Sequence, residues 1–360
     1  MLLVVPDFIQ VYDSGADQIF ASKDPVECHD DFNCQFAKII HGLHSATEYS
    51  KADSNLNGIR PIQLRRVVGR GHYEFSTSKQ QDVEQYIRHL FEIIDNNAPT
   101  GQNPVNAVRF VNVNRFEDIA STHVRYRKHD DYILPLTIPM AYARQSKDDP
   151  ERKTISLKEC ISATFADEAM KMGSFPDYLL LQFKRFAYTA TGEQEKLKVD
   201  VEEVDELDLT AYYSEGLQPG EQALPDDDQP KKTEVDENIV AQITAMDMVD
   251  LNAARRAVRI TKNAGAEAAM NYLLDHFDDV PMEDEPAAQT TGPTNVQVRN
   301  GSGKYRLDGF ISHIGSSPSS GHYVVHLKKN GTWYIYNDEK VAVSQNLPKS
   351  LGYVYLYKRV

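Results

Sequence analysis

Apolar residues recur at helical spacing in the first hundred residues of the chain. Residues 31–44 carry one such stripe, and residues 77–96 carry a stronger one. Ser76 or Thr77 is a candidate N-cap for the second helix, and Asn-Ala-Pro at 97–99 is a stop signal. The pattern therefore predicts a mostly helical N-terminal part.

The period changes towards two after about residue 105. Residues 105–113 and 132–140 alternate like strands, and residues 178–186 form an apolar run typical of a buried strand. Residues 304–360 return to aromatic and β-branched alternation. We expect the strands before residue 200 and those after residue 304 to belong to one sheet. Together with the N-terminal helices this gives the α+β class.

A helical island interrupts this strand pattern. We expect three short helices in it, at 238–245, 251–262 and 266–277, which can pack as a minimal bundle inserted into the larger domain. The predicted division is 1–215, larger domain, first part; 216–235, acidic linker; 236–279, inserted bundle; 280–300, linker; 301–360, larger domain, second part.

Composition and charge narrow the class of partner. Of the 360 residues, 41% are apolar and 26% charged, and the net charge of −14 argues against binding nucleic acid or an anionic membrane. Simple solubility explains this charge equally well. No apolar run reaches the length of a membrane span. Three cysteines are too few for a disulfide framework and lack zinc-ligand spacing, so we expect a reducing cytoplasmic or nuclear setting.

The most informative local pattern is a hairpin near the C-terminus. Asn330-Gly331 between two strand patterns predicts a two-residue turn. That turn would pair residues whose numbers sum to 661, which places Asn337 on the face of His322 and Asp338 on the other face. A histidine oriented by an amide is half of a cysteine-protease triad. A histidine in a sheet hairpin is more often structural, so the hairpin alone leaves both interpretations open.

Three sequence blocks, in order, resemble the ubiquitin-specific protease family. They are QQDVEQY at 80–86, FPDYLLLQFKRF at 175–186, and the histidine box formed by GFISHIG at 309–315, GHY at 321–323 and WYIYND at 333–338. GLQPGE at 216–221, the helical island and NDEKV at 337–341 look like the isopeptidase T branch, where ubiquitin-associated (UBA) modules sit inside the catalytic domain.

The resemblance implies a papain-like fold with a helical thumb, a β-sheet palm and an inserted three-helix UBA-like bundle. It implies hydrolysis of the bond after the C-terminal glycine of ubiquitin, with ubiquitin or polyubiquitin as partner and without a metal or organic cofactor. By the same resemblance, His322 is the general base, Asn337 its orienter and Asp338 a secondary candidate.

Four further positions are implied as ubiquitin-binding. Asp82 and position 85 would face the arginines of the ubiquitin tail, and Gly321 and Tyr323 belong to the histidine box. The family usually has Glu where this chain has Gln85, and an amide there loses a charge-assisted hydrogen bond. A solvent-exposed helix residue is the structural alternative for Asp82.

Two other departures concern the nucleophile and the UBA loop. The Asn-x-Gly-x-x-Cys-aromatic box is absent; by the resemblance its cysteine would lie just upstream of Met1, and no cysteine of this chain has a matching context. The UBA loop reads Met246, Asp247, Met248 in place of Met-Gly-aromatic, which removes easy left-handed backbone and an aromatic anchor. We therefore expect the chain as it stands to be inactive. The alternatives are a non-catalytic ubiquitin-binding scaffold, or an active enzyme whose gene model is incomplete.

The absence of a cysteine box predicts the result of covalent probing. A ubiquitin probe with a C-terminal electrophile should leave all three thiols unlabelled, because none has an activating environment in the sequence. Mass spectrometry after incubation measures this. Labelling of Cys28, Cys34 or Cys160 would contradict the expectation.

Overall fold

The computed structural model describes most of the chain, in two units. The described residues are 1–45, 59–99, 101–118, 121–147, 149–167, 169–188, 194–224, 236–244, 254–255, 257–258, 261, 264–275, 298–317, 320–338 and 340–360. The first unit comprises Met1–Glu117, Arg125–Gly220 and Gln297–Val360. The second comprises Asp118–Val124 and Glu221–Val296.

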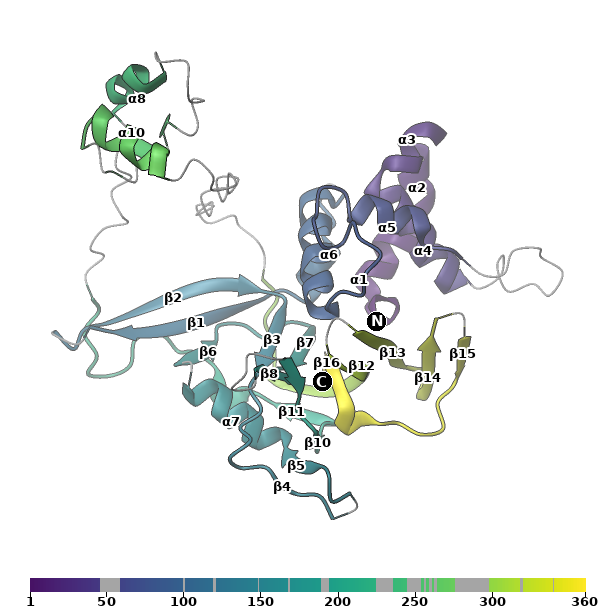
Figure 1. Ribbon diagram of the computed structural model, residues 1–360. Helices are drawn as coiled ribbons and strands as arrows, with labels where there is room; N and C mark the ends of the chain where they lie inside the picture. Colours follow the sequence, from purple (N-terminus) through teal and green to yellow (C-terminus); the bar gives the residue numbers. More distant parts are fainter. Residues whose placement is uncertain are drawn as a thin grey trace. The chain divides into compact units, whose positions relative to one another are not determined.

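The first unit begins with a cluster of helices (Figure 1). They are η1 (Leu2–Val4), α1 (Pro6–Ile9), the π-helical turn η2 (Gln10–Ser14), α2 (Ala16–Ala21), α3 (Pro25–Asp30), α4 (Phe32–Ser45), α5 (Ile62–Val68), α6 (Val83–Asn97) and η3 (Pro104–Ala107). The stripe predicted at 31–44 becomes α4, which buries Phe36 and Ile40; α6 buries Phe91 and Ile94. The helical character predicted for this part is confirmed.

The predicted start of the second helix was wrong. Helix α6 begins at Val83 and not near residue 77, because Asp82 caps it: its Oδ1 accepts hydrogen bonds from the backbone N–H groups of Glu84 (2.8 Å) and Gln85 (3.2 Å). The hydroxyl of Thr77 instead donates to the Glu74 carbonyl.

One large sheet joins the chain segments from both sides of the helical island. Its strand order is β15-β14-β13-β12-β16-β7-β3, and β11 also pairs with β12. The strands are β3 (Ile133–Leu136), β7 (Tyr178–Phe183), β11 (Glu206–Asp208), β12 (Lys304–Ser317), β13 (Ser320–Lys329), β14 (Thr332–Asn337), β15 (Lys340–Val343) and β16 (Gly352–Arg359). Antiparallel pairing of β16 with β7, with Leu356 opposite Leu180, confirms the expectation of a shared sheet.

The remaining strands of this unit form smaller sheets, and helix α7 (Leu157–Asp167) contacts β5 and β6 in two of them. They are β1 (Phe110–Glu117), β2 (Val124–Asp131), β4 (Arg144–Gln145), β5 (Lys153–Ser156), β6 (Met170–Met172), β8 (Phe186–Tyr188), β9 (Gln194–Lys196) and β10 (Val199–Glu202); η4 (Thr210–Tyr212) and η5 (Lys349–Leu351) are 3-10 turns. The strand expected at 105–113 was wrong in its first half. Asn103 accepts a hydrogen bond from the N–H of Val105 and starts the turn η3, so the strand begins at Phe110.

The central strands of the large sheet are buried on both faces. Leu180 and Leu356 lie in one core cluster with side chains of α1, α4 and α6. Their neighbours Leu179 and Tyr355 lie in a second cluster with side chains of α7. Because successive side chains of a strand point to opposite faces, two buried faces produce the uninterrupted apolar run of β7.

A buried arginine joins the end of β7 to the C-terminal strand. Arg185 is 1% exposed. Its guanidinium donates to three backbone carbonyls, those of Val199 (2.7 Å), Ser350 (2.6 Å) and Gly352 (2.7 Å). One side chain thus satisfies acceptors that belong to segments more than 150 residues apart.

The second unit contains the outer helices of the island. Helix α8 (Glu237–Thr244) and helix α10 (Ala266–Asp275) lie where helices were predicted. Of the predicted middle helix, residues 254, 255, 257 and 258 are described and helical. Val240, Ile243, Ala257 and Ala269 share one small buried cluster. Assignment of these helices to a UBA-type bundle stays a prediction. In neither unit does a described helix have the length and apolarity needed to cross a membrane.

Arg185 predicts a large effect on stability. The Arg185→Ala variant should lose about 3–5 kcal/mol of unfolding free energy, because two buried carbonyls and one part-buried carbonyl lose their donor. Urea denaturation measures the loss. Arg144→Ala is the matched control: that side chain is 79% exposed and pairs with Glu159, so it should cost less than about 0.5 kcal/mol. Equal costs would show that solvent replaces the guanidinium.

Candidate active site

The C-terminal hairpin has the predicted register. Lys329 pairs with Thr332 and Val325 with Tyr336, so paired residues sum to 661. The turn residues Asn330 and Gly331 have φ of 50° and 82°, as a two-residue turn with left-handed positions requires. This register decides which side chains of β14 share a face with His322.

The hairpin brings His322 and Asn337 into contact. His322 Nε2 lies 2.6 Å from Asn337 Oδ1. Because an amide oxygen only accepts, Nε2 carries the proton, and in the neutral ring Nδ1 keeps its lone pair free to take a proton. The imidazole is 39% exposed and can therefore meet a substrate or a thiol.

Asp338 is a weaker partner for the same imidazole. Its Oδ2 lies 3.9 Å from His322 Nε2, beyond hydrogen-bond distance, and its side chain is 77% exposed. Asp338 has a φ of 50° and lies in the turn after β14, which directs it away from the strand face.

Gly321 is placed where a side chain would not fit. A Cβ atom added there would lie 2.4 Å from His313 Nε2 and 2.5 Å from the Ile314 carbonyl oxygen. The backbone just before His322 therefore packs directly against strand β12, which holds the start of β13 close to its neighbour.

Asp82 joins helix α6 to the sheet as well as capping the helix. Its Oδ2 accepts a hydrogen bond from the hydroxyl of Tyr353 (2.6 Å), which in turn accepts one from Gln182 Nε2 (2.8 Å). Both oxygens are thus bonded, and Asp82 is not the freely solvated helix residue of the structural alternative. Gln85 is exposed on α6, and Tyr323 is partly buried.

Sequence reasoning gave no functional role to three residues of this region: His313, Gln182 and Tyr353. His313 is buried, with its ring 4.7 Å from that of Tyr323 and 5.8 Å from that of Phe186. Burial and the nearby Lys196 lower the pKa of His313, while Asp82 opposes this shift. Gln182 and Tyr353 lie within apolar strand patterns, where one polar side chain gives no signal of its partner.

The three cysteines lie on helices away from the hairpin strands that carry His322 and Asn337. Cys28 and Cys34 lie on α3 and α4, and Cys160 lies on α7 in the second core cluster. Burial raises the pKa of the Cys160 thiol to about 12, which makes it a poor nucleophile. Among the described residues, no hydrogen bond joins a cysteine to His322.

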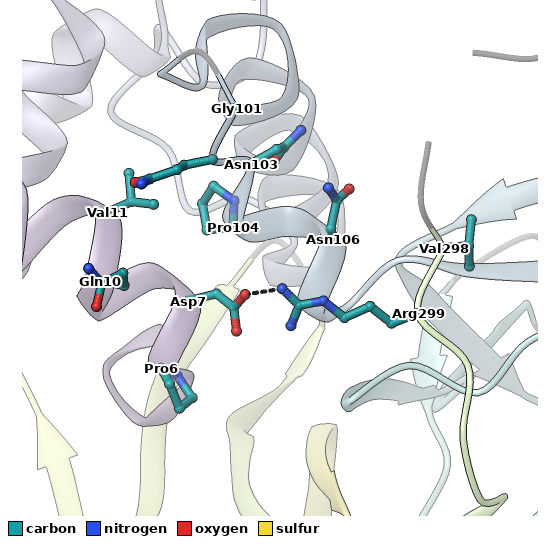
Figure 2. A pocket seen from close by; sticks show the side chains of 11 residues that line it. Pro6, Asp7, Gln10, Val11, Gly101, Asn103, Pro104, Asn106, Val298 and Arg299 are labelled. Carbon is teal, nitrogen blue, oxygen red and sulfur yellow. Dashed lines mark hydrogen bonds and ion pairs between the residues drawn. The ribbon is translucent and has the colours of Figure 1, made fainter. Parts of the chain in front are cut away.

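A cavity of about 800 Å³ lies elsewhere in the first unit. Figure 2 shows its lining from α1, η3 and the segment before β12, with the ion pair between Asp7 and Arg299 beside it. It contains none of the residues predicted to act on ubiquitin, so we do not assign it to the site.

Two further expectations concern metal ligands and the UBA loop. Among the residues that the structure describes, no cluster of three or more His, Cys, Asp or Glu side chains could hold a metal ion. Met246, Asp247 and Met248, the expected UBA loop, lie outside the described residues.

Sequence comparison decides the family. The sequence model described as "Ubiquitin carboxyl-terminal hydrolase" matches residues 1–357. The chain belongs to this family.

Curated relatives agree with the family assignment. Ubiquitin carboxyl-terminal hydrolase 5 of Mus musculus is 30% identical over 517 residues, covering 100% of this chain and 60% of the relative. Ubiquitin carboxyl-terminal hydrolase 13 of Mus musculus is 28% identical, covering 99% of this chain and 58% of the relative. The chain thus spans about 60% of the length of these relatives.

Solved structures show the same fold. The SAGA Ubp8/Sgf11/Sus1/Sgf73 DUB module bound to ubiquitin aldehyde contains a chain that matches 99% of this one at a TM-score of 0.58 and 16% identity, with 65% of that chain covered. The Ubp8-Sgf11-Sgf73-Sus1 SAGA DUB module matches at 0.56 and 16% identity, covering 99% of this chain and 63% of that one. The predicted α+β, ubiquitin-specific protease architecture of helical thumb and β-sheet palm is confirmed.

Two buried histidines near the site predict a pH dependence of stability. Burial lowers the pKa of His313 and of His326 from the ordinary value of 6.5, so the unfolded chain binds protons at higher pH than the folded chain. The stability is fully present above about pH 6.5 and falls as the pH drops below it.

Urea denaturation between about pH 8 and 5 measures this slope. His326→Phe keeps the ring contact with Phe310, 4.6 Å between centroids, and should flatten part of the slope. His29→Gln, which alters an exposed imidazole, is the matched control. An unchanged slope in His326→Phe would mean that other groups cause the pH dependence.

Proposed function

We propose that this chain carries the base and the orienter of a cysteine-type ubiquitin carboxyl-terminal hydrolase. The reaction is hydrolysis of the bond after the C-terminal glycine of ubiquitin, in a monoubiquitin or polyubiquitin substrate. One observation carries the proposal: His322 Nε2 lies 2.6 Å from Asn337 Oδ1, on a hairpin at the exposed end of the palm sheet. Family membership supplies the reaction class.

The contact with Asn337 gives His322 a defined role. Holding the proton on Nε2 leaves Nδ1 to accept a proton from a thiol. The thiolate then attacks the carbonyl carbon of the last glycine, and the imidazolium returns its proton to the leaving amine. Water hydrolyses the thioester, with His322 taking a proton from it. Asn337 acts only on the imidazole, so it is a positioning residue.

The nucleophilic thiol is not assigned to Cys28, Cys34 or Cys160. Cys160 is fully buried, and the other two contact each other. A version of the chain extended before Met1 by a family cysteine box is therefore the form in which catalysis is tested.

Recognition of ubiquitin is proposed at the thumb-palm junction. The SAGA Ubp8 module was solved with ubiquitin aldehyde and with monoubiquitin, which supports ubiquitin as the partner. Asp82, held by Tyr353, offers the negative charge that the arginines of a ubiquitin tail would pair with. Gln85, one turn along α6, offers an exposed amide. Gly321 and Tyr323, at the start of β13, would contact the ubiquitin tail from the side of the sheet.

Three earlier expectations remain predictions. They are the division of the chain at 215, 235, 279 and 300, the assignment of the insertion to a UBA-like bundle, and a cytoplasmic or nuclear compartment. The small core formed by α8, α10 and the residues between them supports a folded insertion.

The proposed roles predict an order of effects on catalysis. In the extended version, Asn337→Ala should lower the acylation rate on the order of 10²-fold, because the imidazole loses its fixed tautomer. Affinity for ubiquitin should change little, since Asn337 contacts the base and not the substrate. Single-turnover hydrolysis of a ubiquitin C-terminal fluorogenic ester or amide measures the rate, and titration of ubiquitin measures the affinity.

Asp338→Ala is the matched control and should lower the acylation rate less, because Asp338 Oδ2 lies 3.9 Å from His322 Nε2 and the side chain is exposed. A larger loss for Asp338→Ala would exchange the two roles. An extended version that binds ubiquitin but does not hydrolyse the substrate would favour the scaffold alternative.

A further inference from the structure

Two cysteines face each other at the junction of helices α3 and α4. The Sγ atoms of Cys28 and Cys34 lie 2.9 Å apart, and both are free thiols. This distance is shorter than ordinary contact between two unbonded sulfurs. Neither cysteine has a place in the proposed hydrolysis.

The chain geometry that makes this contact is built by Asp31. Helix α3 ends at Asp30, and Asp31 has extended backbone angles, φ −92° and ψ 132°. Without this break, residues six apart on one helix would point about 120° apart, about 9 Å along the axis, and could not meet. The Asp31 carboxylate accepts a hydrogen bond from the N–H of Cys34 (2.9 Å) and forms an ion pair with Lys23 (2.8 Å). These two contacts hold the chain in the extended conformation that separates α3 from α4.

The two thiols differ in exposure. Cys34 is 1% exposed and belongs to the core of the helical cluster, whereas Cys28 is partly exposed. The Cys34 S–H donates to Cys28 Sγ. Burial, followed by this hydrogen bond and the nearby Asp31, raises the pKa of Cys34, so Cys34 keeps its proton. Cys28 is thus the sulfur that an incoming reagent meets.

We propose that Cys28 and Cys34 form a dithiol modification site that hydroperoxides convert to an intramolecular disulfide. Cys28 Sγ attacks a peroxide oxygen, the O–O bond breaks, and a sulfenic acid and one water (from hydrogen peroxide) form. Cys34 Sγ then attacks Cys28 Sγ; the S–S bond forms, the S–O bond breaks, and hydroxide leaves with the Cys34 proton as water. The two sulfurs lose two electrons, and the peroxide gains them. In a reducing compartment the pair returns to the dithiol by exchange with a thiol reductant.

The sequence provides an internal comparison for the test. Trypsin cleavage after Lys23 and Lys38 leaves both cysteines in one peptide, Asp24–Lys38, whereas Cys160 falls in Glu159–Lys171. Cys160 is fully buried and has no thiol neighbour among the described residues. The two peptides therefore report the dithiol and an isolated buried thiol in the same molecule.

The experiment treats the folded full chain with limiting hydrogen peroxide, blocks the remaining thiols with N-ethylmaleimide in denaturant, and digests without reductant. We expect the Asp24–Lys38 peptide to lose two hydrogens and carry no maleimide, at a rate at least about tenfold above loss of the Cys160 thiol. Dithiothreitol should restore both thiols.

Two further arms make the result decisive. Phenylarsine oxide, which condenses with two adjacent thiols and releases water, should bind wild type once and should not bind Cys28→Ser; because Cys28 is partly exposed, circular dichroism should show that this variant folds. Asp31→Ala should slow disulfide formation, since it removes the cap that holds Cys34. Oxidation of Cys28 to sulfinic acid without the cross-link, or equal cross-linking rates in native buffer and in denaturing urea, would overturn the proposal.

Discussion

The antiparallel pairing of β16 with β7 is the interaction on which the rest of this fold depends. It joins residues 178–182 to residues 354–358, although the helical island lies between them in the chain. Both faces of the pair are buried, one under the N-terminal helices and one beside α7, so apolar packing holds it from each side. Arg185 extends the same connection by donating to the carbonyls of Ser350 and Gly352. The helical island can be inserted between β7 and β16 because these two strands pair with each other directly and do not need the island for contact.

The candidate site depends on that sheet through two polar connections. Tyr353, next to the pairing strand residues, donates to Asp82 and so ties α6 to the palm. Strand β12, paired with β16 on one side and β13 on the other, carries His313 against Gly321 and thereby fixes the backbone before His322. The backbone before His322 is therefore packed against its neighbour, whereas the imidazole ring is partly exposed. Such an arrangement suits a group that must keep one tautomer while substrate enters and leaves.

The Cys28–Cys34 pair lies in a different part of the thumb and depends on local structure. The two sulfurs meet because Asp31 ends one helix and caps the next. The proposed hydrolysis and the proposed redox chemistry thus lie at separate places, the hairpin of the palm and the α3–α4 junction.

The sequence by itself determined the features that follow from local rules. Asn330-Gly331 fixed the hairpin register, and with it the contact of His322 with Asn337, because a two-residue turn leaves no freedom in pairing. Helical spacing located α4, and the run of 178–186 located β7. Sequence did not locate the true start of α6, where the Asp82 cap replaced Thr77, or the turn η3, where Asn103 displaced a strand. The bond between Asp82 and Tyr353 and the contact of Gly321 with His313 were decided only by the tertiary structure. Each joins residues whose separation in sequence carries no pattern, since packing of the whole sheet, and not local propensity, brings them together.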